Sequence, residues 1–559
     1  MVIHFDELSP AEPDVEEWEA RVEGWVERIR QAEGAETLIE SVREWDLAAR
    51  ELSTWAAWAL IRYCQDTTDA QASARNARLD ALGPPLQALD LRVKRAVLDS
   101  PHLPAATAVL GAQAVALWTL DCQTQDESLV QAQVREATLA SEYSRLVGSA
   151  RVEFQGQTLG LPQLMAWLEH ADRETRHQAA QALWGWYDSN APAIGDIYCQ
   201  LVALRHGMAR SLGEPDFVEH GYRLMRRRGF GPDQIAAFRD ELRTHVVPVV
   251  RSLRRAQSQR LGLPSLKAWD LRVLDLLGNP RPDPSPAVQL DQAVRLFQRL
   301  GLDEFFQTVR RSGVMDLEAR AGKRPGGFCH FLPQVGLPFV FANMNGTSHD
   351  TKVFTHELGH ALQVWSSRHA PLMDLIWPTY DAAEVHSMGL ELLSWPHMDL
   401  FYGAQADRYR RDHLSSAITA LPWMAALDEF QHRVYRQPDA DHDALWKEIE
   451  ASWEPDLDWG DLPHGPQGRR WQAVPHLFST PFYMIDYALA QTCALQLWSL
   501  ARRDPEQAME RYLALCRIGG EAPFLELMAG AGLRSPFEPG LLAELMSEVR
   551  EALDALEAL

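Results

Sequence analysis

Apolar residues recur every three or four positions through most of the sequence, and this spacing constrains the fold more than any other feature. Segments 16–30, 37–52 and 290–300 all show it. Residues three and four apart lie on one face of an α-helix, so each segment predicts a helix with one buried face. No repeat with a period of about 20–50 residues is visible, which argues against a solenoid. We therefore expect a mainly α-helical protein.

Strand signals are confined to two short stretches. Residues 151–159 alternate polar and apolar side chains and contain a turn at Gly156. Residues 326–345 hold two aromatic and β-branched runs on either side of a turn at 333–338. Each stretch predicts a β-hairpin.

Two stretches rich in proline, glycine and aspartate, 278–286 and 453–470, predict loops. Helical periodicity also gives way to the first hairpin near residue 150. We therefore predict an N-terminal helical lobe over residues 1–150 and a larger body over residues 151–559.

Composition restricts the possible partners and the location. The 559 residues carry a net charge of −23, and an acidic surface disfavours nucleic acid and anionic membranes because both are polyanions. The most weakly polar stretch, 107–120, is shorter than the ~20 residues that span a bilayer, and the N-terminus lacks the basic and apolar pattern of a signal peptide. The six cysteines form no CxxC pair, which indicates free thiols. We expect a cytoplasmic protein with no nucleic-acid or membrane partner.

The most informative motif is His356-Glu357-Leu358-Gly359-His360. Residues four apart lie about one turn apart on the same helical face, so the two imidazoles can hold one Zn²⁺. Glu357 is near enough to contact a water at the metal, yet angled away from the metal itself. The motif predicts two zinc ligands with a general base beside them. The alternative is a helix whose two histidines are only solvated or packed.

A zinc site needs a third protein ligand and an open fourth position. The extended motif that supplies a third histidine would need Gly at position 363 and His at position 366, but the chain has Gln363 and Ser366. A glutamate from a following helix is the other option. Glu384 lies 24 residues after His360 in an amphipathic stretch, and two intervening prolines, Pro371 and Pro378, allow the chain to reverse.

Two neighbours of Glu384 have other expected roles. His386 competes as a ligand, but on a helix it points about 200° away from Glu384. Glu391 follows Glu384 by seven residues and returns to nearly the same face, so we expect it to accept a hydrogen bond from a ligand histidine.

A third element lies near the C-terminus, where His476 is followed by Tyr483 and Tyr487. The two tyrosines are four residues apart, so their hydroxyls share a helical face. A neutral tyrosine O–H or histidine N–H can stabilise the negative charge that builds on a carbonyl oxygen under attack. The alternative for the tyrosine pair is core packing with a hydrogen-bonded tip.

Together these residues resemble the thimet-oligopeptidase and oligoendopeptidase F family of zinc peptidases, most closely its bacterial oligoendopeptidase F and Pz-peptidase branch. The likeness spans roughly residues 150 to 550. It is carried by these blocks: GGFCHFLP from Gly326, PFVFANMNGTS from Pro338, residues 356–363, EVHSM from Glu384, and His476 with the two tyrosines.

The resemblance implies a function and a role for each site residue. The protein would be a zinc-dependent oligoendopeptidase that cleaves internal bonds of short unstructured peptides, with the zinc site in the 151–559 body. The implied roles are one zinc ion held by His356, His360 and Glu384, Glu357 as general base, and His476, Tyr483 and Tyr487 facing the substrate carbonyl. The spacing from His476 to Tyr483 differs between branches of the family, so the division of roles between the tyrosines stays open.

The resemblance also implies a bilobed helical fold, with a small β-sheet beside a deep central channel that admits peptides and excludes folded proteins. The hairpin at 326–345 would offer an edge strand to the peptide backbone.

Two alternatives remain. A peptidyl-dipeptidase would use the same zinc site with a cationic pocket for the terminal carboxylate. The arginines at 226–228 are candidates for that pocket, although a solvated turn is the favoured interpretation. A non-catalytic, zinc-stabilised peptide-binding protein is the other alternative, but structural zinc sites are closed by four protein ligands, whereas three are found here. The sequence predicts no oligomeric state.

Overall fold

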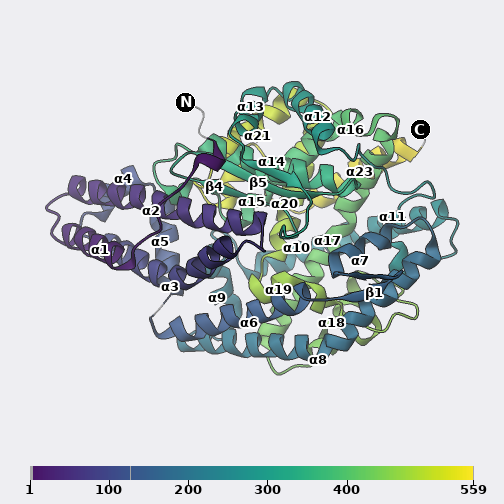
Figure 1. The fold of residues 1–559 in the computed structure, drawn as a ribbon, viewed down its shortest axis with the longest axis horizontal. Helices are drawn as coiled ribbons and strands as arrows, with labels where there is room; N and C mark the ends of the chain where they lie inside the picture. The colour runs from purple at the N-terminus through teal and green to yellow at the C-terminus, as the bar shows by residue number, and fades with distance from the viewer. Residues whose placement is uncertain (1–3, 126, 558–559) are drawn as a thin grey trace.

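A computed structural model describes residues 4–125 and 127–557 (Figure 1). The mainly helical fold is confirmed, with small sheets only. The N-terminal helices are α1 (Val15–Arg30), α2 (Ala35–Gln65), α3 (Ala70–Leu98), α4 (Leu103–Leu110), α5 (Ala112–Thr124) and α6 (Val130–Gly148). The central helices are α7 (Leu161–Ala166), α8 (Arg173–Ser211), α9 (Phe217–Leu224), α10 (Pro232–His245), α11 (Val247–Arg260), α12 (Pro286–Arg299) and α13 (Asp303–Arg311). The later helices are α14 (Ser348–Ser367), α15 (Tyr380–Ser394), α16 (Asp399–Tyr402), α17 (Ala406–Arg436), α18 (His442–Trp453), α19 (Pro475–Ser479), α20 (Met484–Ala501), α21 (Pro505–Ile518), α22 (Phe524–Gly530) and α23 (Leu541–Glu557).

Helices α1 to α5 form a unit of their own at one side of the molecule (Figure 1). Their apolar faces meet in a core that includes the edge-to-face tryptophan pairs Trp18–Trp25 and Trp45–Trp118. Helix α6 instead joins the main core, where the ring of Tyr143 stacks on that of Phe478 in α19. The lobe boundary at residue 150 stays a prediction.

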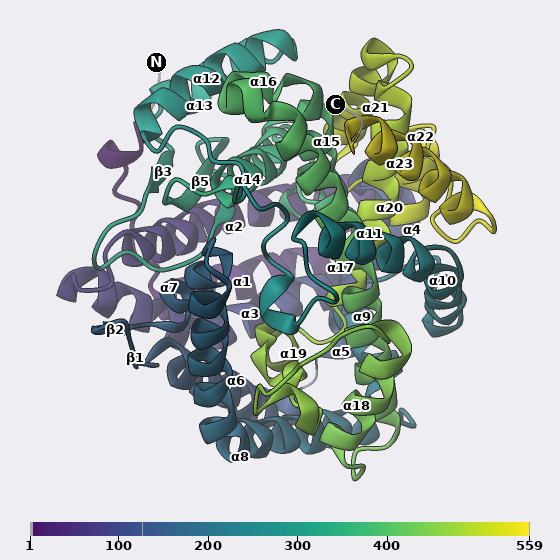
Figure 2. The same ribbon diagram turned by 90° about the vertical axis from the view of Figure 1, so that its right-hand side faces the viewer.

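The main body has two ends. Helices α6, α8 and α18 lie at one end, and α12, α13 and α16 at the other, in both views (Figure 2). Helix α17 packs against helices of the C-terminal part, α18, α20 and α23, and against α10 and α11. Both predicted loops lie within the described residues and contain no α-helix or strand apart from their end residues.

Both predicted hairpins are confirmed. Strands β1 (Val152–Phe154) and β2 (Gln157–Leu159) pair antiparallel, as do β4 (Phe328–Leu332) and β5 (Leu337–Met344). A further strand, β3 (Met315–Glu318), pairs parallel with β5, so the order is β3-β5-β4. Its four residues are too few to give an alternation signal. Helix α14 packs against β4 and β5, which leaves β4 as a sheet edge beside that helix.

Within the described residues, no single helix is long and apolar enough to cross a membrane. Helices α4 and α5 together meet the requirements of length and composition, but they are bent by 115° where they join.

Candidate active site

Helix α14 carries the histidine motif and is fixed at both ends. At its start, the Asp350 carboxylate accepts the backbone N–H groups of Asn345 and Gly346 at 2.8 and 2.6 Å, a favourable place for a negative charge. In its last turns, the side chains of Gln363 and Ser367 both donate to the carbonyl of Ile376, which follows the helix, at 2.8 Å. The predicted chain reversal is confirmed, and Gln363 holds the reversing segment in place.

Gly359 allows α14 and α15 to touch through their backbones. A Cβ atom at this position would lie 2.6 Å from the His386 carbonyl oxygen and 2.6 Å from the Ser387 Cα atom. No larger residue fits that gap without moving a helix. The contact brings Glu384 of α15 against the two histidines of α14.

His356, His360 and Glu384 converge on one point. The Nε2 atoms of His356 and His360 lie 3.2 and 3.5 Å from the Glu384 Oε2 atom. One ligand atom from each residue lies within 4.8 Å of the others, so the group could hold a metal ion. Burial alone would raise the pKa of Glu384, but His360 and His356 outweigh it and hold that pKa well below its ordinary value. The carboxylate is therefore ionised, as a metal ligand must be.

Further polar groups hold two of these three side chains, His356 and Glu384. Glu391 lies where the sequence predicts, with one carboxylate oxygen 2.7 Å from the His356 Nδ1 atom. Its other oxygen is 2.9 Å from the His413 Nε2 atom, and the Ser387 hydroxyl donates to Glu384 at 2.8 Å.

His413 and Ser387 were not among the residues predicted from the sequence. Ser387 follows Glu384 by three residues, so its helical spacing was a usable signal, whereas His413 comes from α17 and gave none. His386 points elsewhere, with its Nδ1 atom 3.1 Å from the Ala382 carbonyl oxygen, and it is not in the cluster.

Glu357 is buried beside the cluster and is only 7% exposed. It forms no hydrogen bond or ion pair with the side chains that the structure describes. A Cβ atom on Gly327, just before β4, would lie 3.2 Å from its Oε1 atom, so Glu357 faces the start of the edge strand. Burial raises the pKa of its carboxyl group above the ordinary value. A carboxylate with a raised pKa is a stronger proton acceptor.

The C-terminal trio of His476, Tyr483 and Tyr487 lies together beside the histidine–glutamate cluster. The ring centroid of His476 lies 5.7 Å from that of Tyr483 and 6.1 Å from that of Tyr487. The Tyr483 hydroxyl donates to the Glu384 Oε1 atom at 2.5 Å, which ties the trio to the cluster. Burial raises the pKa of Tyr483 well above its ordinary value, so its hydroxyl stays protonated and able to donate.

Phe482 sets the position of Tyr483. Its φ of +67° is rare for a residue with a side chain. Its N–H donates to the Gln431 Oε1 atom at 2.7 Å, and its carbonyl accepts from Arg227 at 2.6 Å. Its ring lies over Gly221, where a Cβ atom would be 2.6 Å from the ring. These contacts hold the backbone in an unfavourable conformation immediately before Tyr483.

The arginine run at 226–228 is neither a solvated turn nor a free cationic pocket, so the favoured interpretation was wrong. Arg226 binds Asp121 of α5 through two nitrogens, at 2.8 and 2.6 Å. Arg227 is buried and donates to Asp486 at 2.7 Å. Arg228 donates a hydrogen bond to the side-chain oxygen of Gln113 in α5. The run joins α5 to the segment that carries Tyr483.

Comparisons with known proteins agree with this fold. Residues 166–547 match peptidase family M3, and residues 5–125 match the peptidase M3 N-terminal domain. The structure of Pz peptidase A with an inhibitor has a TM-score of 0.95 at 34% identity, covering 99% of both chains. A protein assigned as oligoendopeptidase F has a TM-score of 0.95 at 35% identity, covering 100% of both chains. Another from Bacillus anthracis str. Ames has a TM-score of 0.90 at 34% identity, covering 99% of this chain and 98% of that one. No curated protein matched.

The fold and these matches define the chain as a peptidase, with peptides as its substrates. More particularly, the chain belongs to peptidase family M3. The resemblance drawn from the sequence is thereby confirmed.

Proposed function

We propose that this peptidase is a zinc-dependent oligoendopeptidase that hydrolyses internal bonds of short unstructured peptides. The observation that carries the proposal is the convergence of His356, His360 and Glu384 within 4.8 Å, with Glu357 beside them. The two compared structures described as oligoendopeptidase F support cleavage within peptides rather than at their ends.

One Zn²⁺ ion fits this group of side chains. Two imidazole nitrogens and one carboxylate oxygen are a set that zinc prefers, and three protein ligands leave a position open for chemistry. A Zn²⁺ bound there would lower the pKa of a water and polarise the scissile carbonyl. Glu391 orients His356 through its Nδ1 atom, which supports the ligand role of that histidine.

The protein's own residues move the protons. Glu357 takes a proton from the attacking water and later delivers it to the leaving amine. Tyr483, Tyr487 and His476 face the carbonyl and hold the negative charge that develops on its oxygen. The edge of β4 pairs with the peptide backbone and orients it past Glu357.

We also propose that the protein acts in the cytoplasm. All six cysteines lie in the described part of the chain, and none forms a disulfide. Thiols that stay reduced support a reducing compartment.

The variant Glu357→Gln tests the general base. It should bind zinc like the wild type and lose ~10³-fold or more in peptide hydrolysis, because only proton transfer is removed. Zinc content by elemental analysis and hydrolysis of a short peptide measure the two effects. Glu36→Gln, at an exposed position on α2, is the matched control. Near-normal turnover in Glu357→Gln would contradict the assignment.

A further inference from the structure

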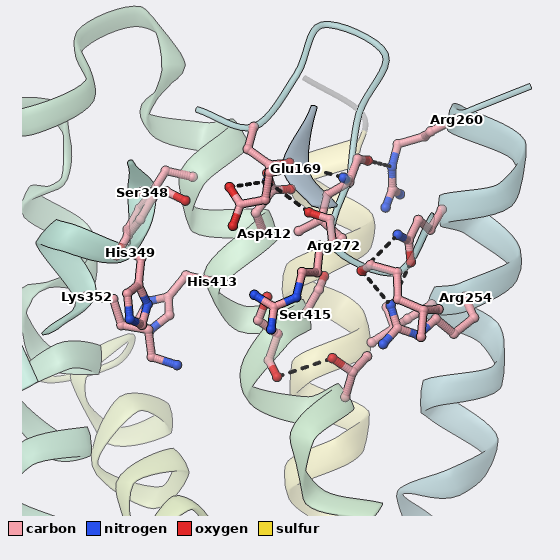
Figure 3. Close-up of a pocket in the computed structure, with 18 residues that line it drawn as sticks. Glu169, Arg254, Arg260, Arg272, Ser348, His349, Lys352, Asp412, His413 and Ser415 are labelled. Atoms are coloured by element: carbon pink, nitrogen blue, oxygen red, sulfur yellow. Dashed lines mark hydrogen bonds between the residues drawn. The ribbon is translucent and has the colours of Figure 1, made fainter. Parts of the chain in front are cut away.

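A cavity of about 250 Å³ lies alongside α14, the helix that carries His356 and His360 (Figure 3). His349 and Lys352 of α14 line one side, and Arg254 of α11 lines the other. Arg272, from the loop after α11, extends between them (Figure 3). His413 also lines the cavity, and it contacts Glu391, the residue that holds His356. Two side chains, His413 and Glu391, therefore connect the cavity to the proposed ligand His356.

Three cations in this cavity have a carboxylate in their surroundings but are not paired with it: Glu454 acts on Arg254, Glu169 on Arg272, and Lys352 on Glu391. Arg254, Arg272 and Lys352 form no ion pair with any side chain that the structure describes. Arg254 donates only to a neighbouring glutamine side chain and a backbone carbonyl, at 2.8 and 3.2 Å. The guanidinium of Arg272 and the ammonium of Lys352 form no hydrogen bond at all within the described chain. Burial lowers the pKa of both arginines; Glu454 opposes this shift at Arg254 and Glu169 opposes it at Arg272, while the nearby Arg470 adds a smaller repulsion.

Most other charged groups around the cavity are paired. Asp412 is paired with Arg411 at 2.9 Å, whereas Glu169 accepts only a hydrogen bond from an asparagine at 3.2 Å and its charge acts on Arg272. Arg260 is paired with Glu557.

Two groups near the α14 side are Glu391 and His349. Both oxygens of Glu391 accept from or face histidines, and its negative charge also acts on Lys352. Burial, Lys352 and Arg272 lower the pKa of His349 to about 4, so it is neutral at pH 7. Four cationic side chains and two carboxylates line the cavity, in a chain whose net charge is −23.

We propose that this cavity binds a carboxylate of the peptide substrate, with Arg272 and Lys352 as the contacting cations and Arg254 reinforcing them. The proposal rests on the proposed peptidase site. Arg254 and Lys352 are half-buried, and Arg272 is exposed. An unpaired cation that is partly removed from water is costly, and an anion that enters the cavity offsets the cost with charge-assisted hydrogen bonds. The carboxylate is either the C-terminus of the peptide or an aspartate or glutamate side chain.

The position of the cavity limits where the carboxylate lies along the peptide. Lys352 precedes His356 by four residues and His349 precedes it by seven, which is about 6 and 10 Å along a helix. An extended peptide advances about 3.3 Å per residue. The carboxylate therefore lies about two to three residues from the cleaved bond. The cavity thus selects where along an acidic peptide the cut falls.

Four peptides of one sequence test the proposal. They combine a free or amidated C-terminus with Glu or Gln three residues from the mapped cut. For the wild type, we expect kcat/KM to rise at least ~10-fold when a carboxylate is present, mainly through KM, because the charge acts in binding. If kcat/KM falls when the C-terminus is amidated, the bound group is the terminal carboxylate. If kcat/KM falls when Glu is replaced by Gln, the bound group is a side-chain carboxylate.

Variants assign the effect to the cavity. Arg272→Gln and Lys352→Gln should bring the ratio between acidic and neutral peptides towards one, and Arg272→Lys should restore part of it. Arg255→Gln is the matched control, because Arg255 is the exposed neighbour of Arg254 on α11 and does not line the cavity. Equal kcat/KM for all four peptides in the wild type, or a ratio unchanged in both glutamine variants, would overturn the proposal.

A binding measurement separates this proposal from the proposed function. The same four peptides, fluorescently labelled, are titrated by anisotropy against Glu357→Gln, with and without Arg272→Gln. If the wild type cleaves none of them, the proposed function fails, and tighter binding of the acidic peptides that Arg272→Gln abolishes still supports the cavity. Equal binding of acidic and neutral peptides to Glu357→Gln would overturn the cavity assignment, whether or not the wild type is active.

Discussion

Replacing Gly359 with alanine should disrupt the zinc site without changing any proposed ligand. The new Cβ atom would lie 2.6 Å from two backbone atoms of α15, whereas ordinary contact begins at 3.4 Å, so the helices must separate by about 0.8 Å. The displaced atoms belong to His386 and Ser387, two and three residues after Glu384, so Glu384 moves with them. Ligand distances tolerate only ~0.2 Å. We expect a loss of ~1–3 kcal/mol of stability from overpacking, and a fall in zinc affinity of at least ~10–100-fold.

Two assays and one control check this prediction. Thermal unfolding of the metal-free protein measures stability, and competition with a fluorescent chelator measures zinc affinity. Gly185→Ala in α8 is the matched control, because its Cβ atom would meet nothing within 4 Å. The control should retain zinc affinity and gain ~0.4–1 kcal/mol in stability, since alanine restricts the unfolded chain. Wild-type zinc affinity in Gly359→Ala would refute the argument that this close contact sets the ligand geometry.

Three further predictions follow from the same structure. Glu391→Gln removes the charge that orients His356, so zinc affinity should fall ~10–100-fold in the chelator competition, and unchanged affinity would contradict that role. One of the two tyrosine hydroxyls should stabilise the carbonyl oxygen, so one of the variants Tyr483→Phe and Tyr487→Phe should lose ~10²–10³-fold in kcat with little change in KM. Small losses of kcat in both variants would assign this role to His476 instead. Burial lowers the pKa of His464 from 6.5 to about 4. Between pH 4 and pH 6.5, the unfolded chain therefore binds a proton at this histidine that the folded protein does not bind. The free energy of unfolding should therefore fall by up to ~1.4 kcal/mol for each pH unit of acidification in this range. The variant His464→Asn should have a flatter slope of unfolding free energy against pH. A slope equal to that of the wild type would contradict this prediction.

Local patterns were predictable from the sequence because they depend on neighbours along the chain. The four-residue spacing of His356 and His360 fixes their common face whatever surrounds the helix. The return of Glu391 to the face of Glu384 follows from the same geometry. Both hairpins were also predictable, since each combines alternating residues with a turn.

Features that depend on distant partners were not predictable. The polarity of the arginines at 226–228 suggested solvent, but their partners, Asp121 and Asp486, lie more than 100 residues away along the chain. Strand β3 forms by pairing with β5, and its own residues carry little signal. The φ of +67° at Phe482 is held by side chains distant in sequence, Gln431 of α17 and Arg227 of the loop after α9, so neither glycine nor asparagine marks the position.

Digestion of a mixed set of short peptides and one folded protein, followed by mass spectrometry, tests the central claim most directly. Zinc-loaded wild type, wild type with a chelator, and Glu357→Gln run side by side. We predict internal cuts in the short peptides only, lost with the chelator and lost in the variant. Intact peptides after treatment with the zinc-loaded wild type would contradict the account, as would cleavage that persists in the chelator.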